Sequence, residues 1–530
     1  MGRSFTLIYH KLTNKSQVPE YILSTKKEII YPIIGYMFSG NLLIILNIFF
    51  PLKSAFVYAF LFLTVAFNFV NINIKIKDFL IFKNIFFYLV IPSILIISTY
   101  NVFFHYDAGF YHLNHQNWLR ESNMILGFVN IFWAFGMSSI HEYVSSILWF
   151  ENNFVSLHFL NLLFISFFYI FLSDNLISQK FKPLRNASLF IFIFSILDNF
   201  GFNGGRNGFI YIEGVAKQDI ATAILFFYIS LIGIFIISKE VKMTDFEIIL
   251  FSLLALLTIQ LKLNSVILFL LYLFVLYKQI KLRDSLRSIL FTHLSVFFFA
   301  SIWIVKTFLT TGCLIFPLSL TCINSFDWYE GGSSVVFESI SKESSLNYQI
   351  GTSFALWLEK YLDYELYKGI LLNFSLSLFF LILIKLIIFE KTKNSNYIYV
   401  FLFIYILSNL SYLLFFGPIP RYGIGIMMTI IGSLGLLSGE IKFQYKKIVA
   451  YTTIFLSVFF LVRADSYKSF LGNDSLILFD PRPVAKYVQF NENWVIPDEG
   501  DQCWVNLKCT MNMDDIQLID KGLFKTAYKY

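Results

Sequence analysis

Charged residues are scarce in this sequence. Only 14% of its 530 residues are Asp, Glu, Lys or Arg, whereas 57% are hydrophobic and 20% are aromatic. The mean hydropathy is +0.67. A soluble domain could not cover that much apolar surface, and the repeated apolar runs of about 20 residues have the length needed to cross a bilayer. The composition therefore predicts a polytopic membrane protein whose backbone polar groups are paired within helices.

Several functional signatures are also missing. The sequence has no GxSxG, HExxH or kinase motif. Its first residues lack a long apolar core and a small-residue cleavage site, so we expect the first span to act as an uncleaved signal. The net charge of +7 is spread over short loops rather than gathered on one face. We therefore expect no binding of nucleic acid.

The long apolar runs predict an all-α integral membrane protein with about 13 transmembrane helices. The expected spans are 29–50, 54–74, 79–99, 155–173, 187–200, 219–238, 246–261, 264–278, 288–309, 367–390, 397–416, 421–438 and 447–463.

Lysine and arginine gather in alternate loops of this arrangement, as the positive-inside rule requires. We therefore expect a cytoplasmic N-terminus. The external parts would be three loops within a transmembrane domain of residues 1–463, followed by a small C-terminal segment. The loops are about 101–154, 201–218 and 310–366, and the segment is 464–530.

Cysteine is rare, and all four cysteines fall in segments predicted to be external. The two close pairs predict disulfides Cys313–Cys322 and Cys503–Cys509, because disulfides persist in oxidising compartments. Four free thiols remain the alternative, since connectivity cannot be read from a sequence. Zinc binding is less favoured, because neither pair has CxxC spacing.

The richest group of ionisable residues lies in the first external loop, in 101–142. Asp107 follows an apolar span and precedes a pattern typical of an amphipathic helix, which we expect to lie along the membrane interface. The Asp107 side chain could cap that helix. It could equally be a general base facing a water-filled cavity. His112 and Glu121, in the same stretch, are candidate substrate-binding residues.

Two arginines near predicted external boundaries are further candidates. Arg206 lies among glycines in 201–221, a pattern that can close around a phosphate. Arg421 opens a span after two prolines, where a guanidinium can bind a lipid-linked phosphate. A plain flexible loop around Arg206, and an Arg421 that only reaches toward lipid headgroups, are the alternatives.

Scattered motifs resemble a bacterial group of membrane proteins that is similar to the GT-C glycosyltransferases. The matching positions are Asp107, then Tyr111, His112 and Leu113, then Trp118, then Gly127 with Asn130. The runs TTGCLIFP, PRYGIG and GDQCWVNLKCT are similar to it as well. Many GT-C enzymes carry a second acid beside the first-loop aspartate, whereas here Ala108 follows Asp107.

The resemblance implies a GT-C-like fold in a bacterial inner membrane and an inverting glycosyltransferase. The donor would be a polyprenyl-phosphate-linked sugar, and the acceptor a cell-surface glycan or glycolipid. Asp107 would act on the acceptor hydroxyl, and Arg206 and Arg421 would stabilise the phosphate. No cofactor is implied with certainty, and a divalent metal is left open. An O-antigen polymerase or ligase is the main alternative. A transporter of lipid-linked glycans fits less well, because no repeated halves are visible.

Overall fold

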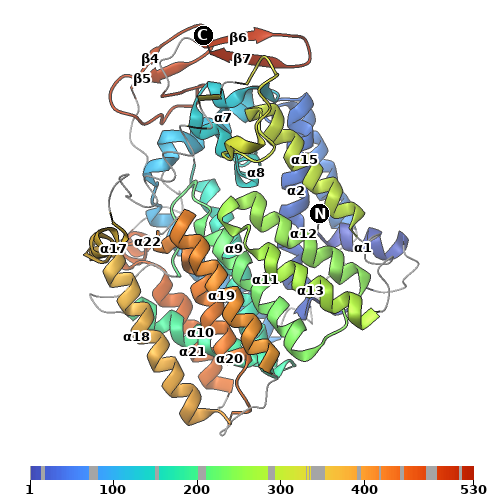
Figure 1. The fold of residues 1–530 in the computed structure, drawn as a ribbon, viewed down its shortest axis with the longest axis vertical. Coiled ribbons are helices and arrows are strands. Elements are labelled where there is room, and N and C mark those ends of the chain that lie inside the picture. Colours follow the sequence, from blue (N-terminus) through green and yellow to red (C-terminus); the bar gives the residue numbers. More distant parts are fainter. Residues whose placement is uncertain are drawn as a thin grey trace.

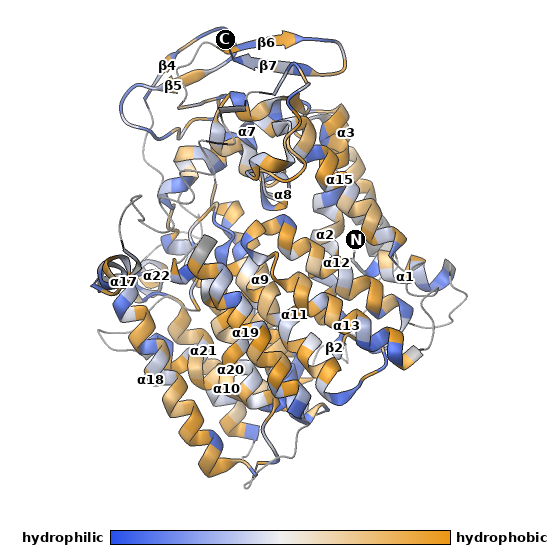
Figure 2. Ribbon diagram, viewed as in Figure 1, coloured by the Kyte–Doolittle hydropathy of each residue, from blue (hydrophilic) through white to orange (hydrophobic). Residues whose placement is uncertain are grey.

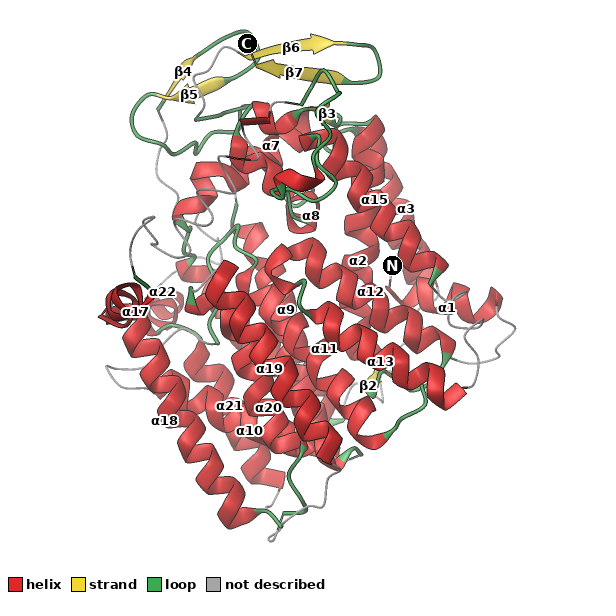
Figure 3. Ribbon diagram, in the orientation of Figure 1, coloured by secondary structure: helices red, strands yellow, loops and turns green. Residues whose placement is uncertain are grey.

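The computed structural model describes most of the chain. The described residues are 2–12, 18–70, 81–149, 154–178, 180–200, 210–283, 293–329, 331–332, 335, 353–363, 365–390, 396–416, 419–441, 447–472, 486–511 and 516–529. Figures 1 and 3 show a large helical body with a small layer of strands at the top.

The helical body contains many long α-helices. They are α2 (Lys27–Phe49), α3 (Ala55–Val70), α9 (Val155–Ser178), α10 (Lys182–Phe200), α11 (Asp219–Lys239), α12 (Asp245–Leu261), α13 (Leu268–Arg283), α15 (Leu294–Thr311), α18 (Glu365–Ile388), α19 (Asn396–Phe416), α20 (Ile424–Leu436) and α21 (Lys447–Leu461).

Shorter helices and turns connect the long ones. They are α1 (Gly2–Leu12), α5 (Phe82–Ile85), η1 (Phe86–Val90), α6 (Ile91–Ile96), η2 (Ile97–Asn101), η3 (Ala108–His112), α7 (Leu113–Glu121), η4 (Phe128–Asn130), η5 (Trp133–Met137), α8 (Ile140–Ser146), η6 (Leu263–Ser265), η7 (Ser319–Thr321), α17 (Phe354–Asp363), η8 (Pro420–Gly423) and α22 (Ala464–Gly472).

The number of membrane spans is smaller than the sequence predicts. Seven helices of the described part are long and apolar enough to cross a membrane, or eight if the bent pair α21 and α22 is one span. The prediction of about 13 spans is therefore wrong. Among the other predicted spans, α20 has 13 residues, and at 1.5 Å per residue it reaches only about 20 Å. Another, α10, carries Lys182, Arg185 and Asp198.

The helix α11 lies at the centre of the body. All of its residues from Asp219 to Ile237 are buried, whereas only 17% of the apolar stretch of α18 is buried. Figure 2 shows the outer helices α18 and α19 as largely apolar, which fits helices that face lipid. Glycines of α20 let it approach α11 closely: a Cβ on Gly425 would lie 2.9 Å from the Phe226 side chain. Small residues serve this purpose at helix contacts in membranes.

Described residues that flank several of the predicted cytoplasmic loops meet at one end of the body. Lys182, at the start of α10, pairs with Glu440 beyond α20. The Tyr397 hydroxyl of α19 donates to the Ile237 carbonyl near the end of α11, at 3.1 Å. The helix α11 begins at Asp219, at its other end. The residues around Asp219 therefore lie a full helix length away from the basic residues.

The chain is not all-α, because strands form a separate unit near its C-terminus. In this C-terminal unit (residues 486–529), β4 (Tyr487–Gln489) pairs antiparallel with β5 (Val495–Pro497), and β6 (Ile516–Asp520) with β7 (Lys525–Lys529). The two-residue strand β3 (Ile125–Leu126) of the first loop pairs parallel with β7. A second short hairpin, β1 (Tyr21–Ile22) and β2 (Thr25–Lys26), precedes α2. Open strand edges suit a unit outside the bilayer, where water can satisfy backbone groups.

Both predicted cysteine pairs are joined in the structure. Cys313–Cys322 closes the turn after α15, and Cys503–Cys509 lies in the C-terminal unit with its Cα atoms 6.2 Å apart.

Candidate functional site

Asp107 lies at the start of the turn η3, but it does not cap it. Its side chain accepts no hydrogen bond from that turn and is instead ion-paired with Lys217. The His105 Nδ1 atom lies 3.6 Å from the same carboxylate. The capping prediction is therefore wrong, because an ammonium from a distant loop takes the place of the backbone N–H groups.

The helix α7, which follows this turn, is not exposed at a surface. All of its residues from Leu113 to Arg120 are buried, since α8 packs against them and the C-terminal unit covers Trp118. The indole nitrogen of Trp118 donates to the Cys509 carbonyl at 3.1 Å. The expected interfacial helix thus exists, but it lies inside the protein, where the Gln116 amide donates to Glu142 and Arg120 donates to the Ser146 carbonyl.

The charges around Asp107 keep its carboxylate ionised. Burial alone would raise its pKa, but the Lys217 ammonium outweighs burial, and the pKa lies below its usual value. Burial, together with the Lys217 charge, lowers the pKa of His105 to about 4. Its ring accepts the backbone N–H of Asp107 at 3.2 Å, which requires an unprotonated nitrogen. At neutral pH the turn therefore presents a carboxylate beside a neutral imidazole.

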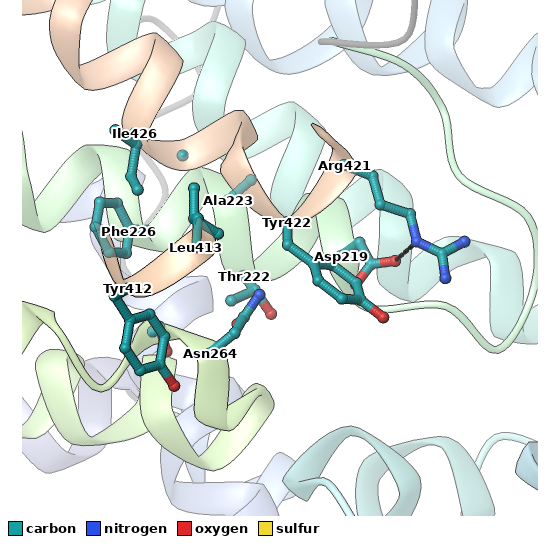
Figure 4. A pocket seen from close by; sticks show the side chains of 12 residues that line it. Asp219, Thr222, Ala223, Phe226, Asn264, Tyr412, Leu413, Arg421, Tyr422 and Ile426 are labelled. Atoms are coloured by element: carbon teal, nitrogen blue, oxygen red, sulfur yellow. Dashed lines mark ion pairs between the residues drawn. The ribbon is translucent and has the colours of Figure 1, made fainter. Parts of the chain in front are cut away.

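A second ionic group lies at the start of α11. Asp219, in the first turn of that helix, is ion-paired with Lys262. The Arg421 Nε atom lies 3.6 Å from the other oxygen of Asp219, as Figure 4 shows. Lys262 also sits 4.0 Å from the centre of the Tyr422 ring. Two cations therefore share one buried carboxylate.

Glu213 links the two ionic groups. It is 3% exposed, and its carboxyl accepts the Ile220 backbone N–H at 2.9 Å. Burial, and next the charge of Asp219, raises the pKa of Glu213 to about 8, so it is protonated at neutral pH. Three cations, Lys217, Lys262 and Arg421, then face the two ion-paired carboxylates of Asp107 and Asp219. The cluster carries an excess of positive charge.

A small pocket opens beside this cluster. Asp219, Thr222, Asn264, Arg421 and Tyr422 line its polar part, and Ala223, Phe226, Leu413 and Ile426 line its apolar part. The Asn264 side-chain oxygen is buried and has no hydrogen-bond partner among the described residues. Such an orphan acceptor suits the hydroxyl of a bound molecule. One site thus combines an apolar wall, a free acceptor and surplus positive charge.

The comparisons with known proteins identify the family. A family model described as Domain of unknown function (DUF8201) matches residues 5–428. The chain belongs to this family. No curated protein and no solved structure matches the chain. The DUF8201 segment contains the whole ionic cluster and the cavity, and it ends before the C-terminal unit.

The other predicted residues of this DUF8201 protein have different positions. His112 is buried and bonds through Nδ1 to Glu142, whose second oxygen accepts from the Gln116 amide at 2.7 Å. Glu121 lies at the surface, 3.0 Å from Lys53, and joins no part of the ionic cluster. Arg206 lies outside the described residues. Within the described ranges, no three His, Cys, Asp or Glu side chains are grouped so that they could hold a metal ion.

Sequence reasoning missed four members of the DUF8201 cluster: Glu213, Lys217, Asp219 and Lys262. The signal that could have found them is charge at the ends of apolar spans, since ionisable groups at such depth mark functional sites by default. Three of the four lie within nine residues of Tyr211 along the chain. They lie in the second half of the stretch 201–221, in which only Arg206 was predicted to be a site residue.

Proposed function

We propose that this protein is a membrane glycosyltransferase that uses a polyprenyl-phosphate-linked sugar to modify a cell-surface glycan or glycolipid. The observation that carries the proposal is the cavity beside Asp219 and Arg421, with an apolar wall on one side and surplus positive charge on the other. A lipid-linked phosphate has the same two parts.

The donor would bind through both of its ends. The phosphate would take up the surplus positive charge of Arg421 and Lys262, because guanidinium and ammonium groups make strong charge-assisted hydrogen bonds to phosphate oxygens. The first isoprene units would pack on Phe226, Leu413 and Ile426, which line the apolar part. The Asn264 oxygen would accept a sugar hydroxyl.

The transfer itself is a substitution at the anomeric carbon. The acceptor hydroxyl oxygen attacks that carbon, the new C–O bond forms, and the bond to the phosphate oxygen breaks with inversion. The hydroxyl proton passes to Asp107, whose carboxylate is kept ionised by Lys217. The polyprenyl phosphate leaves with the bonding electrons, and the cations stabilise its growing charge.

A reaction of an O-antigen polymerase or ligase is the second candidate. Three cations against two ion-paired carboxylates also suit a polyprenyl diphosphate, which carries more negative charge. The two candidates differ in the donor they consume, so a polyprenyl-phosphate sugar and a polyprenyl-diphosphate glycan, offered separately to the purified protein, distinguish them.

We place the site at the external face of a bacterial inner membrane. The cluster lies at the end of α11 opposite the basic loops, and basic loops face the cytoplasm. An external site would receive a donor after it had crossed the membrane.

Asp107→Asn tests the function. The substitution keeps the size of the side chain and removes its ability to take the acceptor proton. We expect the modified glycan to disappear from a deletion strain complemented by the variant, at unchanged membrane abundance. Rate losses of about 100-fold or more are usual for a lost acid or base.

Two further variants give the experiment its controls. Arg421→Ala should raise the KM for the donor, because a phosphate contact is lost. Asp465→Asn is the matched control, since the Asp465 side chain is 70% exposed and lies on α22. Wild-type glycan in the Asp107→Asn strain at equal abundance would refute a catalytic role for Asp107.

A further inference from the structure

A disulfide-closed loop of the C-terminal unit lies directly on the turn that carries Asp107. This disulfide loop (Asp501–Cys509) is closed by Cys503–Cys509. The backbone N–H of Cys503 donates to the Gly109 carbonyl at 2.8 Å. The hydroxyl of Tyr106 donates to the Asp501 carboxylate. The loop therefore contacts Tyr106, one residue before Asp107, and Gly109, two residues after it.

The fit between loop and turn depends on a glycine. A Cβ on Gly109 would lie 2.5 Å from the Gln502 side-chain oxygen and 2.6 Å from the Trp504 ring, closer than real Cβ contacts. The Trp504 ring also meets the Phe104 ring edge-on, with centroids 5.8 Å apart. Phe104 precedes Asp107 and Gly109 follows it, so the loop holds the turn from both sides.

The same loop supports the segment that carries Lys217. Trp504 packs against a buried apolar cluster that includes Ala108 and Val215. The backbone N–H of Val215 donates to the Phe103 carbonyl at 2.9 Å. The two segments that supply the Asp107–Lys217 ion pair are thus joined to each other beneath one tryptophan.

The second cysteine fastens the far end of the buried helix. The Cys509 carbonyl accepts the Trp118 indole N–H at 3.1 Å, and the Thr510 hydroxyl donates to the Ile131 carbonyl at 3.0 Å. The disulfide therefore joins Cys503, which binds the turn η3, to Cys509, which binds the helix α7. This unit lies beyond residue 428, where the family match ends.

We propose that the disulfide loop is a positioning segment, which holds the Asp107 turn and its Lys217 partner in register over the cation cluster. With the loop in place, the carboxylate of Asp107 is fixed for the transfer step. Without it, the donor still binds at Arg421 and Lys262, because neither residue contacts the loop among the described contacts. The part of this inference that concerns transfer rests on the proposed function.

The first test measures hydrogen exchange of the turn in the full-length protein in lipid nanodiscs. In a Cys503→Ser, Cys509→Ser double variant we expect faster amide exchange over residues 106–117. The matched control is the Cys313→Ser, Cys322→Ser double variant, whose disulfide lies elsewhere and should leave that exchange unchanged. Unchanged exchange in the first variant, or equal acceleration in the control, overturns the positioning role.

The second test separates binding from chemistry. Gly109→Ala keeps both disulfides but pushes against Gln502 and Trp504. Gly369→Ala on α18, where nothing lies within 4 Å of a new Cβ, is its control. We expect kcat to fall by up to about 100-fold, the usual cost of a misplacement near 1 Å, with the KM for a polyprenyl-phosphate sugar unchanged. A raised KM at normal kcat contradicts the proposal.

The two ideas can fail separately. If the wild-type protein transfers no sugar but exchange of the turn accelerates in the Cys503→Ser, Cys509→Ser variant, the glycosyltransferase proposal fails and the positioning role stands. If transfer is normal in the Gly109→Ala variant and exchange is unchanged, the positioning role fails and the glycosyltransferase proposal stands.

Discussion

At the scale of single residues, the site contains carboxyl groups whose surroundings give them different protonation states. Asp107 is partly buried beside Lys217 and stays ionised. Glu213, a few residues from Lys217 along the chain, is buried beside Asp219 and holds its proton to a pKa of about 8. Environments that separate the pKa values of neighbouring acids are typical of functional sites.

Glu213 makes the stability of the protein depend on pH. Its folded-state pKa of about 8 is raised from 4.5, so between these values the folded state binds a proton that the unfolded chain has released. Stability should therefore fall as pH rises through this interval. Glu213→Gln removes that loss, which is on the order of 5 kcal/mol at pH 9. Apparent melting temperatures in detergent at pH 5, 7 and 9 measure the effect.

The control for this prediction is Glu359→Gln, because Glu359 is exposed on α17. Its pH profile should follow that of the wild type. Parallel wild-type and Glu213→Gln profiles from pH 5 to 9 would show that Glu213 is not protonated in the folded state.

Breaking the buried His112–Glu142 pair should destabilise the protein more than breaking an exposed pair. Both side chains are 3% exposed, and leaving a buried polar group without its hydrogen-bond partner costs about 1–3 kcal/mol. Glu142→Gln should therefore lower the melting temperature clearly. Glu121→Gln, which breaks the half-exposed pair with Lys53, should cost less than about 1 kcal/mol. Equal melting temperatures for the two variants would contradict this assignment.

At the scale of secondary-structure elements, the packing of α20 depends on glycine. A Cβ on Gly435 would lie 2.5 Å from the Asn186 carbonyl oxygen and 2.8 Å from the Ala187 Cα atom of α10. These are backbone atoms, which cannot move aside as a flexible side chain can. The short helix α20 is therefore held between α10 and α11 by close backbone approach rather than by its length.

Gly435→Ala should destabilise the protein by about 1–3 kcal/mol, the usual cost of overpacking. Gly369→Ala, on the lipid-facing helix α18, should be neutral or stabilising by up to about 1 kcal/mol, because alanine has the higher helix propensity. Resistance to thermal unfolding in detergent compares the two. A Gly435→Ala protein as stable as the wild type would mean that α10 and α20 can move apart freely.

Sequence patterns predicted the positions of the helices in the body well, but they overestimated how many of these helices span the membrane. Apolar runs find helices such as α2 and α9, because a span needs about 20 apolar residues. They also find α12 and α20, which are apolar because other helices surround them. The ion pair of Asp107 could not be predicted, because its partner Lys217 lies 110 residues away in the sequence. The two-residue strand β3 gave no signal, since its partner strand comes at the other end of the chain.

At the scale of the whole molecule, the arrangement of charge predicts its orientation. Lys182 and Lys278 flank two of the predicted cytoplasmic loops and lie near the end of α11 that is farther from Asp219. The C-terminal strands lie at the top of the body in Figure 1. A single cysteine at Gly500→Cys should therefore react with an impermeant maleimide on intact cells. A cysteine at Lys182→Cys should react only after lysis. Shielding of position 500 before lysis would reverse the topology.

The pairing of β3 with β7 also constrains how the protein is made. The side chain of Asn123 in the first loop donates to the carbonyl of Leu523, 400 residues later in the chain. At translation rates of about 20 residues per second, at least ~20 s separate the synthesis of these partners. During that interval the first loop has no cover from the C-terminal unit for Trp118 and its neighbours. A loop made early in synthesis is thus completed by strands that are made much later.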